Sequence, residues 1–299
     1  MESGSVLKGL VYGGFASCVA ETVTMPVDVV KTRLQMDGSG GSIKVYNGSI
    51  DCAQKLVKAE GPGSLFKGLP PALVRQSTYG SLRYGLYGPI KNSLGIKAGE
   101  KVPLWKKIVA GGLAGGIASA VANPTDLIKV RLQTDGMTKD AEGKLLPKRF
   151  SGMVHAFTTV VKEEGVLALW TGVGPTVGRA TALAAAELAT YDEVKGILLN
   201  TGYFQPGLLL TVCTAFASGY VSTVASSPFD VVKSRVMGQP LNPDGTGKLY
   251  SGMVDCFVKS SASEGPMSLY NGFWPNFGRV VPRVTIVFVV MEQLKKNFG

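Results

Sequence analysis

The chain has 299 residues, of which 45% are hydrophobic and 17% charged, and it carries a net charge of +10. A soluble domain usually has nearer a quarter charged residues, so this composition favours a membrane protein that meets anionic lipid or an anionic solute. No Lys/Arg-rich run or zinc-ligand spacing indicates nucleic acid binding, and the four cysteines lack CxxC pairing, so we expect reduced thiols and no disulfide framework.

Six long apolar segments follow one another along the chain, and a polar stretch with a short amphipathic helix separates the members of each pair. Polar residues interrupt them, whereas a lipid-facing single span needs about 20 apolar residues. Helices around a wet cavity can keep such polar groups on their inner faces. We therefore predict an all-α membrane protein with six transmembrane helices, at residues 6–37, 70–92, 105–135, 174–197, 207–238 and 274–296.

Three sequence motifs each occur three times in the same order, which is the mark of an internal repeat. The motif Pro-x-Asp-x-x-Lys-x-Arg begins at Pro26, Pro124 and Pro228. An aromatic-x-Gly motif then ends at Gly48, Gly152 and Gly252. Glu-Gly and a second aromatic-x-Gly follow, and the latter ends at Gly68, Gly172 and Gly272. We assign repeats to residues 1–100, 101–203 and 204–299, and an even number of spans per repeat allows a pseudo-threefold axis along the membrane normal.

The first motif has a direct physical meaning. A proline inside a helix removes a backbone hydrogen bond and bends the helix, so we expect Pro26, Pro124 and Pro228 to kink the odd-numbered long helices. The Asp and Lys that follow are three residues apart and share one helix face. Around a threefold axis, each Asp can meet the Lys of the next repeat.

Together these motifs resemble the signature of the mitochondrial carrier family, and the resemblance covers essentially the whole chain. It implies a ring of ion pairs that closes the matrix side, namely Asp28–Lys129, Asp126–Lys233 and Asp230–Lys31. It also implies a glutamine brace four residues beyond each lysine. Gln35 and Gln133 match this pattern, whereas Met237 does not, so the closed state should lack one brace.

The resemblance implies a second gate, on the cytoplasmic side, with the pattern aromatic-acid-x-x-base. The full pattern occurs at Tyr191, Asp192 and Lys195, and partial copies provide Tyr87, Lys91, Glu292 and Lys295. The implied pairs are Asp192–Lys295 and Glu292–Lys91. Gly88 replaces the remaining acid, which leaves Lys195 without its partner. We expect this gate to be the weaker one, because exposed ion pairs contribute only about 0–1 kcal/mol each.

Equivalent arginines mark the predicted substrate site. Arg75, Arg179 and Arg279 each lie 13 residues before a cytoplasmic-gate acid position. An arginine at the bilayer centre costs about 2.5–3.5 kcal/mol on insertion scales, so such residues usually face a cavity. Converging guanidiniums suit multiply charged anions, because arginine binds carboxylate bidentately. Further candidate contacts on the even-numbered helices are Gln76, Tyr79, Arg83, Glu187 and Arg283.

Glu21 lies inside the first long helix. It can serve as a proton-coupling group or as a counter-charge for an arginine, and we favour the counter-charge.

The stretch from Arg75 to Tyr79 resembles the oxoglutarate, dicarboxylate and uncoupling-protein branch of the family. Residues 11–21 and 269–276 look most like the brain and kidney uncoupling-like carriers. The branch implies a monomeric antiporter of the inner mitochondrial membrane for malate, oxoglutarate, sulfate, thiosulfate or phosphate, working by alternating access. Two alternatives stay open, namely proton transport linked to fatty acids and a carrier-fold scaffold subunit of a respiratory complex.

The sequence indicates a transporter and not an enzyme. A single histidine excludes a multi-histidine metal site, and no nucleotide-binding or calcium-binding loop occurs. Unpaired N–H groups at helix starts favour bound anions, and the resemblance implies structural cardiolipin there; we expect no other cofactor. By resemblance, the six motif glycines from Gly48 to Gly272 would hold its phosphates between repeats, although glycines there can also serve as turn residues.

Overall fold

The computed structural model describes residues 2–41, 44–93, 95, 104–137, 149–203, 205, 207–240, 242 and 246–298. Within these residues the secondary structure is helical, with short 3-10 turns between some helices. The α-helices are α1 (Glu2–Met36), α2 (Ser49–Glu60), α3 (Leu69–Ser93), α4 (Leu104–Thr134), α5 (Met153–Glu164), α6 (Val173–Asn200), α7 (Leu208–Gly238), α8 (Met253–Glu264) and α9 (Phe273–Phe298).

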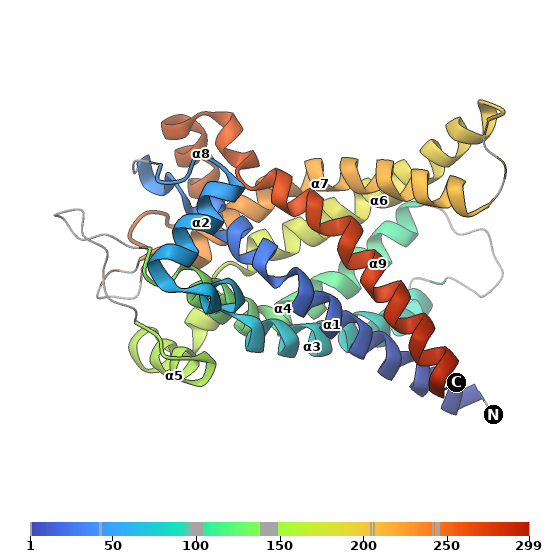
Figure 1. Ribbon diagram of the computed structural model, residues 1–299, viewed down its shortest axis with the longest axis horizontal. Helices are drawn as coiled ribbons and strands as arrows, with labels where there is room; N and C mark the ends of the chain where they lie inside the picture. Colours follow the sequence, from blue (N-terminus) through green and yellow to red (C-terminus); the bar gives the residue numbers. More distant parts are fainter. Residues whose placement is uncertain are drawn as a thin grey trace.

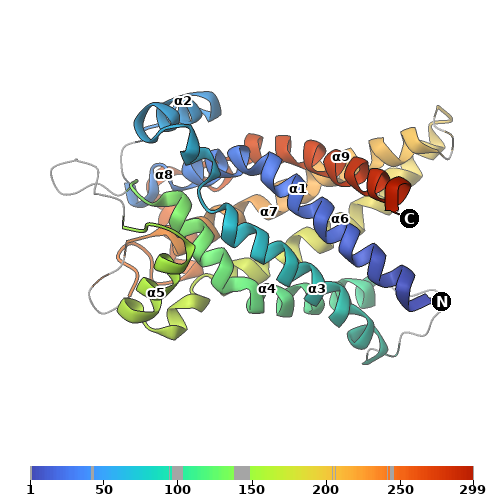
Figure 2. The ribbon, with the colours of Figure 1, turned by 60° about the horizontal axis from the view of Figure 1, so that its bottom comes forward.

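The order long helix, short helix, long helix occurs three times, and the six long helices agree with the predicted segments to within a few residues at their ends. Figures 1 and 2 show the short helices α2, α5 and α8 at one end of the molecule and both termini at the other. Among the described residues, no helix is both long and apolar enough to count as a candidate membrane span.

The long helices form a closed circle. The most extensive contacts join consecutive repeats, through α3 with α4 and α6 with α7, while α1 packs along α9. The last contact joins the first and third repeats, and α1 and α9 lie side by side in both views (Figures 1 and 2). This arrangement places one face of every long helix towards a common axis.

The three motif prolines lie inside continuous helices. Pro26, Pro124 and Pro228 are within α1, α4 and α7, which run on to Met36, Thr134 and Gly238. A proline removes one backbone hydrogen bond without always ending a helix. The Asp, Lys and Arg of each motif therefore lie on the last helical turns of an odd-numbered long helix.

Apolar packing concentrates at the end with the short helices. Each short helix is amphipathic and buries one face against the preceding long helix. Leu56 packs with Val29, and Cys256 with Val232, in separate clusters. Burying a side chain of the size of leucine stabilises the folded protein by about 1.5–3 kcal/mol. The short helices thus hold the motif-bearing ends of α1, α4 and α7 in place.

Candidate functional site

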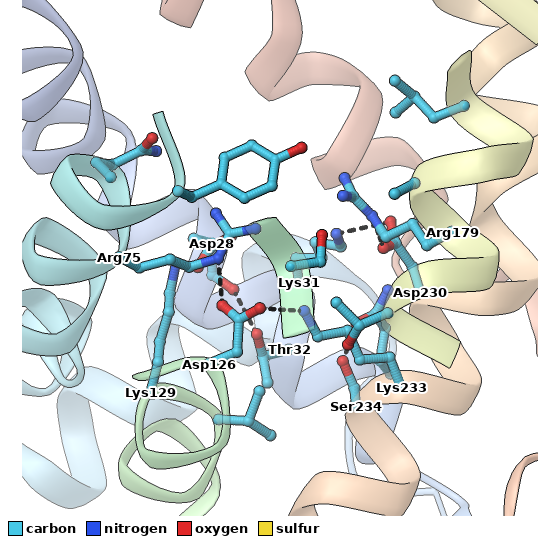
Figure 3. A pocket seen from close by; sticks show the side chains of 18 of the residues that line it. Asp28, Lys31, Thr32, Arg75, Asp126, Lys129, Arg179, Asp230, Lys233 and Ser234 are labelled. Carbon is cyan, nitrogen blue, oxygen red and sulfur yellow. Dashed lines mark hydrogen bonds and ion pairs between the residues drawn. The ribbon is translucent and has the colours of Figure 1, made fainter. Parts of the chain in front are cut away.

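A central cavity of about 290 Å³ lies among the six long helices, next to the motif-bearing ends of α1, α4 and α7. Every long helix contributes lining residues, and most of them are charged or polar. Figure 3 shows the side chains that converge on this cavity. The described lining residues include Asp28, Lys31, Arg75, Tyr79, Asp126, Lys129, Arg179, Asp230, Lys233, Arg279 and Arg283.

All three implied ion pairs of the matrix-side ring are formed. The lysine Nζ to carboxylate oxygen distances are 2.8 Å for Lys129 to Asp28, 2.7 Å for Lys233 to Asp126, and 3.0 Å for Lys31 to Asp230. Each pair joins two different repeats, and all six side chains are largely buried. These pairs therefore tie α1, α4 and α7 together at one end of the cavity.

The three equivalent arginines point into the cavity and reach the same carboxylates. Arg75 pairs with Asp126, Arg179 pairs with Asp230, and Arg279 pairs with Asp28. Figure 3 shows two of these contacts, from Arg75 to Asp126 and from Arg179 to Asp230. The sequence did not indicate these pairings.

Each ring carboxylate thus receives two cations from the other two repeats. Asp126 in the second repeat, for example, contacts Arg75 of the first repeat and Lys233 of the third. Buried carboxylates are costly unless they are paired and hydrogen-bonded. The arginines predicted to bind substrate therefore also stabilise the closed ring.

The glutamine braces differ among the three interfaces. Gln133 donates to Asp28 over 3.1 Å and accepts from Thr32 over 2.8 Å. Gln35 accepts a hydrogen bond from Ser234 over 2.7 Å. Both glutamines therefore pair with a hydroxyl on the neighbouring odd-numbered helix.

The third interface has an apolar pair in place of a brace. Met237 is fully buried in a hydrophobic cluster with Val130. Val130 occupies the place of Thr32 and Ser234 in the other repeats. The missing brace is thus accompanied by loss of its hydroxyl partner, and packing replaces the hydrogen bond.

A fourth carboxylate joins the network. Glu21 accepts from Lys129 over 2.8 Å and from Gln76 over 3.0 Å, and the Arg283 guanidinium lies 3.9 Å away. A counter-charge for an arginine was the favoured sequence interpretation. The structure adds that the nearest cation is a gate lysine, which sequence spacing did not indicate.

Tyr79 and Arg283 lie one helical turn beyond the arginine trio, with Leu183 at the equivalent position of α6. The Arg75 guanidinium stacks on the Tyr79 ring at 5.1 Å from its centroid. This layer has one cation, one aromatic ring and one aliphatic side chain, so it breaks the threefold symmetry. The side chains of the candidates Arg83 and Glu187 lie outside those described.

The predicted cytoplasmic gate is described only in part. Tyr191 is half-buried, and Lys195 and Glu292 are exposed. The remaining side chains of that gate, namely Tyr87, Lys91, Asp192 and Lys295, lie outside those described. The gate pairs implied by the resemblance therefore stay predictions.

The motif glycines form two groups that differ in the space available for a side chain. Gly68, Gly172 and Gly272 have φ between 78° and 79°, a region that favours glycine. A Cβ on Gly68 would lie 3.0 Å from the Lys129 carbonyl oxygen, and one on Gly272 would lie 3.0 Å from that of Lys31. These glycines therefore let each even-numbered helix approach the gate.

The glycines of the second group, Gly48, Gly152 and Gly252, directly precede the short helices α2, α5 and α8. A Cβ there would meet nothing within 4 Å. A second cavity of about 260 Å³ lies between the starts of α2 and α9 and is lined by Lys44, Gly48, Asn271, Gly272 and Trp274, among others.

A further layer of polar contacts involves the motif arginines, which the sequence interpretation left without a role. Arg33 donates to Glu60 over 2.9 Å and, through Nε, to the Gln133 carbonyl oxygen over 2.6 Å. Arg131 and Arg235 repeat this arrangement with Glu164 and Glu264. Each arginine thus joins its own short helix to the next odd-numbered helix. The recurring Glu-Gly motif was the sequence signal for its partner.

Comparison with known proteins places this geometry in a family. The family model described as mitochondrial carrier protein matches residues 2–98, 100–202 and 205–299. Mitochondrial uncoupling protein 1 of Arabidopsis thaliana is 43% identical over 297 residues, covering 98% of this chain and 94% of that protein. The mitochondrial substrate carrier family protein ucpB of Dictyostelium discoideum is 38% identical, with 96% and 95% covered. Kidney mitochondrial carrier protein 1 of Xenopus laevis is 35% identical, with 97% of both chains covered.

Proposed function

Because this chain belongs to the mitochondrial carrier family, we propose that it exchanges small anions by alternating access. It is a transporter and a multi-pass protein of the inner mitochondrial membrane. The proposed substrates are dicarboxylates such as malate and oxoglutarate, together with sulfate, thiosulfate or phosphate. The convergence of Arg75, Arg179 and Arg279 from three repeats on one cavity carries the proposal.

The charge of the cavity supports a doubly or triply charged anion. Seven basic side chains and three carboxylates are among the described lining residues, and Glu21 supplies a fourth carboxylate through Lys129. The seven basic side chains exceed the four carboxylates by three positive charges. A volume of about 290 Å³ suits a small metabolite. Arginine's planar fork favours carboxylate and sulfate or phosphate oxygens, since it can donate two parallel hydrogen bonds.

The shared carboxylates suggest how binding and opening are coupled. An anion that takes the guanidinium of Arg75 competes with Asp126 for it. Among the described residues, Asp126 then keeps Lys233 as its one ionic partner. The same loss follows at the other two carboxylates, so the ring of ion pairs weakens when substrate binds. A ligand shifts such an equilibrium by as much as its affinity differs between the two states.

Exchange in proteoliposomes tests the proposal. Uptake of labelled malate or sulfate should require internal counter-substrate and fall at least tenfold in Arg179→Ala. Lys55→Ala is the matched control, because Lys55 is exposed, contacts Asp51 and the Val45 carbonyl oxygen, and does not line the cavity. Absence of exchange across a broad anion panel would overturn the proposal. Recovery of the protein at fixed stoichiometry in a respiratory assembly would then favour the scaffold.

Proton transport linked to fatty acids is the second candidate function. It is favoured by the similarity to two Arabidopsis thaliana proteins named mitochondrial uncoupling proteins, at 42% and 43% identity. It predicts fatty-acid-dependent proton flux into proteoliposomes that purine nucleotides inhibit. This flux should also be sensitive to substitution of Glu21. Anion exchange without such proton flux would exclude this candidate.

We further propose that cardiolipin phosphates bind at the motif glycines. The cavity between α2 and α9 combines Gly48 and Gly272 with Lys44. Asn271 precedes Gly272, whereas Lys67 precedes Gly68 in the first repeat, and Lys44 supplies a cation at the same cavity. Added cardiolipin should raise the melting temperature of the solubilised wild-type protein, and Lys44→Ala should reduce this shift. An equal shift in both proteins would exclude a role for Lys44.

A further inference from the structure

Glu21 is a buried carboxylate that extends the threefold ring of ion pairs in one repeat. It is 2% exposed and lies two helical turns before Asp28 on α1, at a spacing that keeps both residues on one face. One Glu21 oxygen contacts Lys129 of α4, and the other contacts Gln76 of α3 and lies 3.9 Å from Arg283 of α9. This one side chain therefore bridges all three repeats.

The other two repeats have no such carboxylate. The equivalent positions are Ser119 in α4 and Thr223 in α7, and both are buried and uncharged. Thr223 donates to the Gly219 carbonyl of its own helix over 2.7 Å. Among the described odd-numbered helices, the additional ionic contact thus joins α1 to α4.

Lys129 is held by two carboxylates at equal distance. Its Nζ lies 2.8 Å from Asp28 and 2.8 Å from Glu21. Arg279 neutralises Asp28 from the far side, and Arg283 does so more weakly for Glu21. The result is an alternating chain of charges in which α4 contributes the central cation. Low local dielectric strengthens each contact in such a chain, provided that every member keeps its partner.

The three interfaces of the gate are consequently unequal. Between α1 and α4 there are the ion pair, the Gln133 brace and Glu21. Between α4 and α7 the described contacts comprise the ion pair of Lys233 with Asp126, a hydrogen bond from Arg131 to the Met237 carbonyl oxygen, and apolar packing of Met237. Opening therefore requires fewer polar contacts to break at α4 and α7 than at α1 and α4.

We propose that Glu21 is a positioning residue that adds a second ionic level to the matrix-side gate and locks α1 to α4. The lock keeps this gate closed until an anion has taken the cavity arginines. This role rests on the proposed exchange function. It adds a residue to the gate that the threefold motif does not contain.

A double-mutant cycle on the substrate-free protein tests the contact itself. Glu21→Gln should lower the melting temperature by roughly 5–10 °C, because it leaves a buried cation short of a partner. The loss should largely vanish in a Lys129→Gln background and persist in Lys129→Arg. Arg283→Gln provides a second background if Lys129→Gln does not fold, and the Glu21→Gln loss should shrink there. Equal losses in every background would overturn the lock.

A transport measurement separates a gate role from a general structural one. Glu21→Gln should raise counter-substrate-independent anion efflux several-fold, and Glu21→Asp should restore most of the wild-type dependence. Leu56→Ala is the control for lost stability, since Leu56 is buried at the short-helix end of the molecule. Thr223→Val is the control for position. Neither control should raise the efflux.

The outcomes of the two experiments are distinguishable from failure of the proposed function. If the wild-type protein exchanges no anion, the exchange proposal fails while the thermal cycle still tests the lock. If exchange occurs and Glu21→Gln leaves both melting temperature and efflux unchanged, the lock is overturned. Loss of proton flux in Glu21→Gln at unchanged stability would likewise overturn it, and would favour a proton-carrying carboxylate.

Discussion

The buried ion pair of Arg235 with Glu264 offers the sharpest stability test. The Arg235 side chain is fully buried and donates to both Glu264 oxygens over 2.6 and 2.7 Å. It also donates to the Ser260 hydroxyl over 2.7 Å and to the Gln35 carbonyl over 3.1 Å. One guanidinium therefore joins α7 and α8 to the end of α1.

Arg235→Met should destabilise the protein by about 3–5 kcal/mol, because it removes one partner of a buried pair and leaves Glu264 uncompensated. The Glu264 side chain is only 7% exposed, so water cannot replace the lost partner without local unfolding. Replacing both partners, with Arg235→Met and Glu264→Leu, should recover much of this loss, since no buried charge is then left.

Thermal unfolding with a thiol-reactive dye measures this effect, because Cys256 in α8 is buried in the folded protein. The single substitution should lower the melting temperature by roughly 6–15 °C. Lys259→Met is the matched control on the same helix, since its pair with Asp255 is exposed and should contribute little to stability. Equal shifts for Arg235→Met and Lys259→Met would refute this reasoning.

Three further outcomes are expected. Gly272→Ala should destabilise by about 1–3 kcal/mol in thermal unfolding, because its φ is 78° and a Cβ would meet the Lys31 carbonyl. Gly63→Ala should not destabilise the protein, because a Cβ there would meet nothing within 4 Å. Equal effects of the two substitutions would contradict the requirement for glycine at position 272. Burial raises the pKa of the Cys256 thiol to about 11, so alkylation of the folded protein at pH 8 should be about 100-fold slower than for a thiol of pKa 9. The stability linked to this thiol is full below the pKa of the unfolded thiol and is lost as pH rises towards 11, which urea titrations at pH 8 and pH 10.5 would check. Met237→Gln should destabilise the protein by about 1–3 kcal/mol. Adding Val130→Thr should recover about 1 kcal/mol, because the two new side chains can form a hydrogen bond. Strictly additive changes in the free energy of unfolding would contradict this pairing.

The sequence predicted both the approximate ends of the long helices and the inward orientation of their polar residues. Helix ends follow from local signals, and α7, for example, begins at Leu208 and ends at Gly238 close to the predicted bounds. The helix faces depend on which neighbours pack against them. Polar residues such as Asp126 interrupt an apolar segment in the sequence, yet they lie on its inner face.

The resemblance to the carrier family implied the matching of each Asp to the Lys of the next repeat. The sequence by itself determined the repeats and the six long and three short helices. Those features depend on local periodicity and on motif recurrence, which are present in the linear chain. Threefold placement of Arg75, Arg179 and Arg279 at one depth also follows from equal spacing within the repeats.

Only the tertiary structure decided which charges share a partner. Arg279 and Asp28 are far apart in the chain, as are Lys129 and Glu21, and their contacts depend on how closely α9, α1 and α4 approach. A side-chain contact between helices is set by their crossing and by rotamers, because a shift of one helical turn changes every partner. Linear spacing contains no such information, so the double use of each carboxylate became visible only when the three repeats were packed around one cavity.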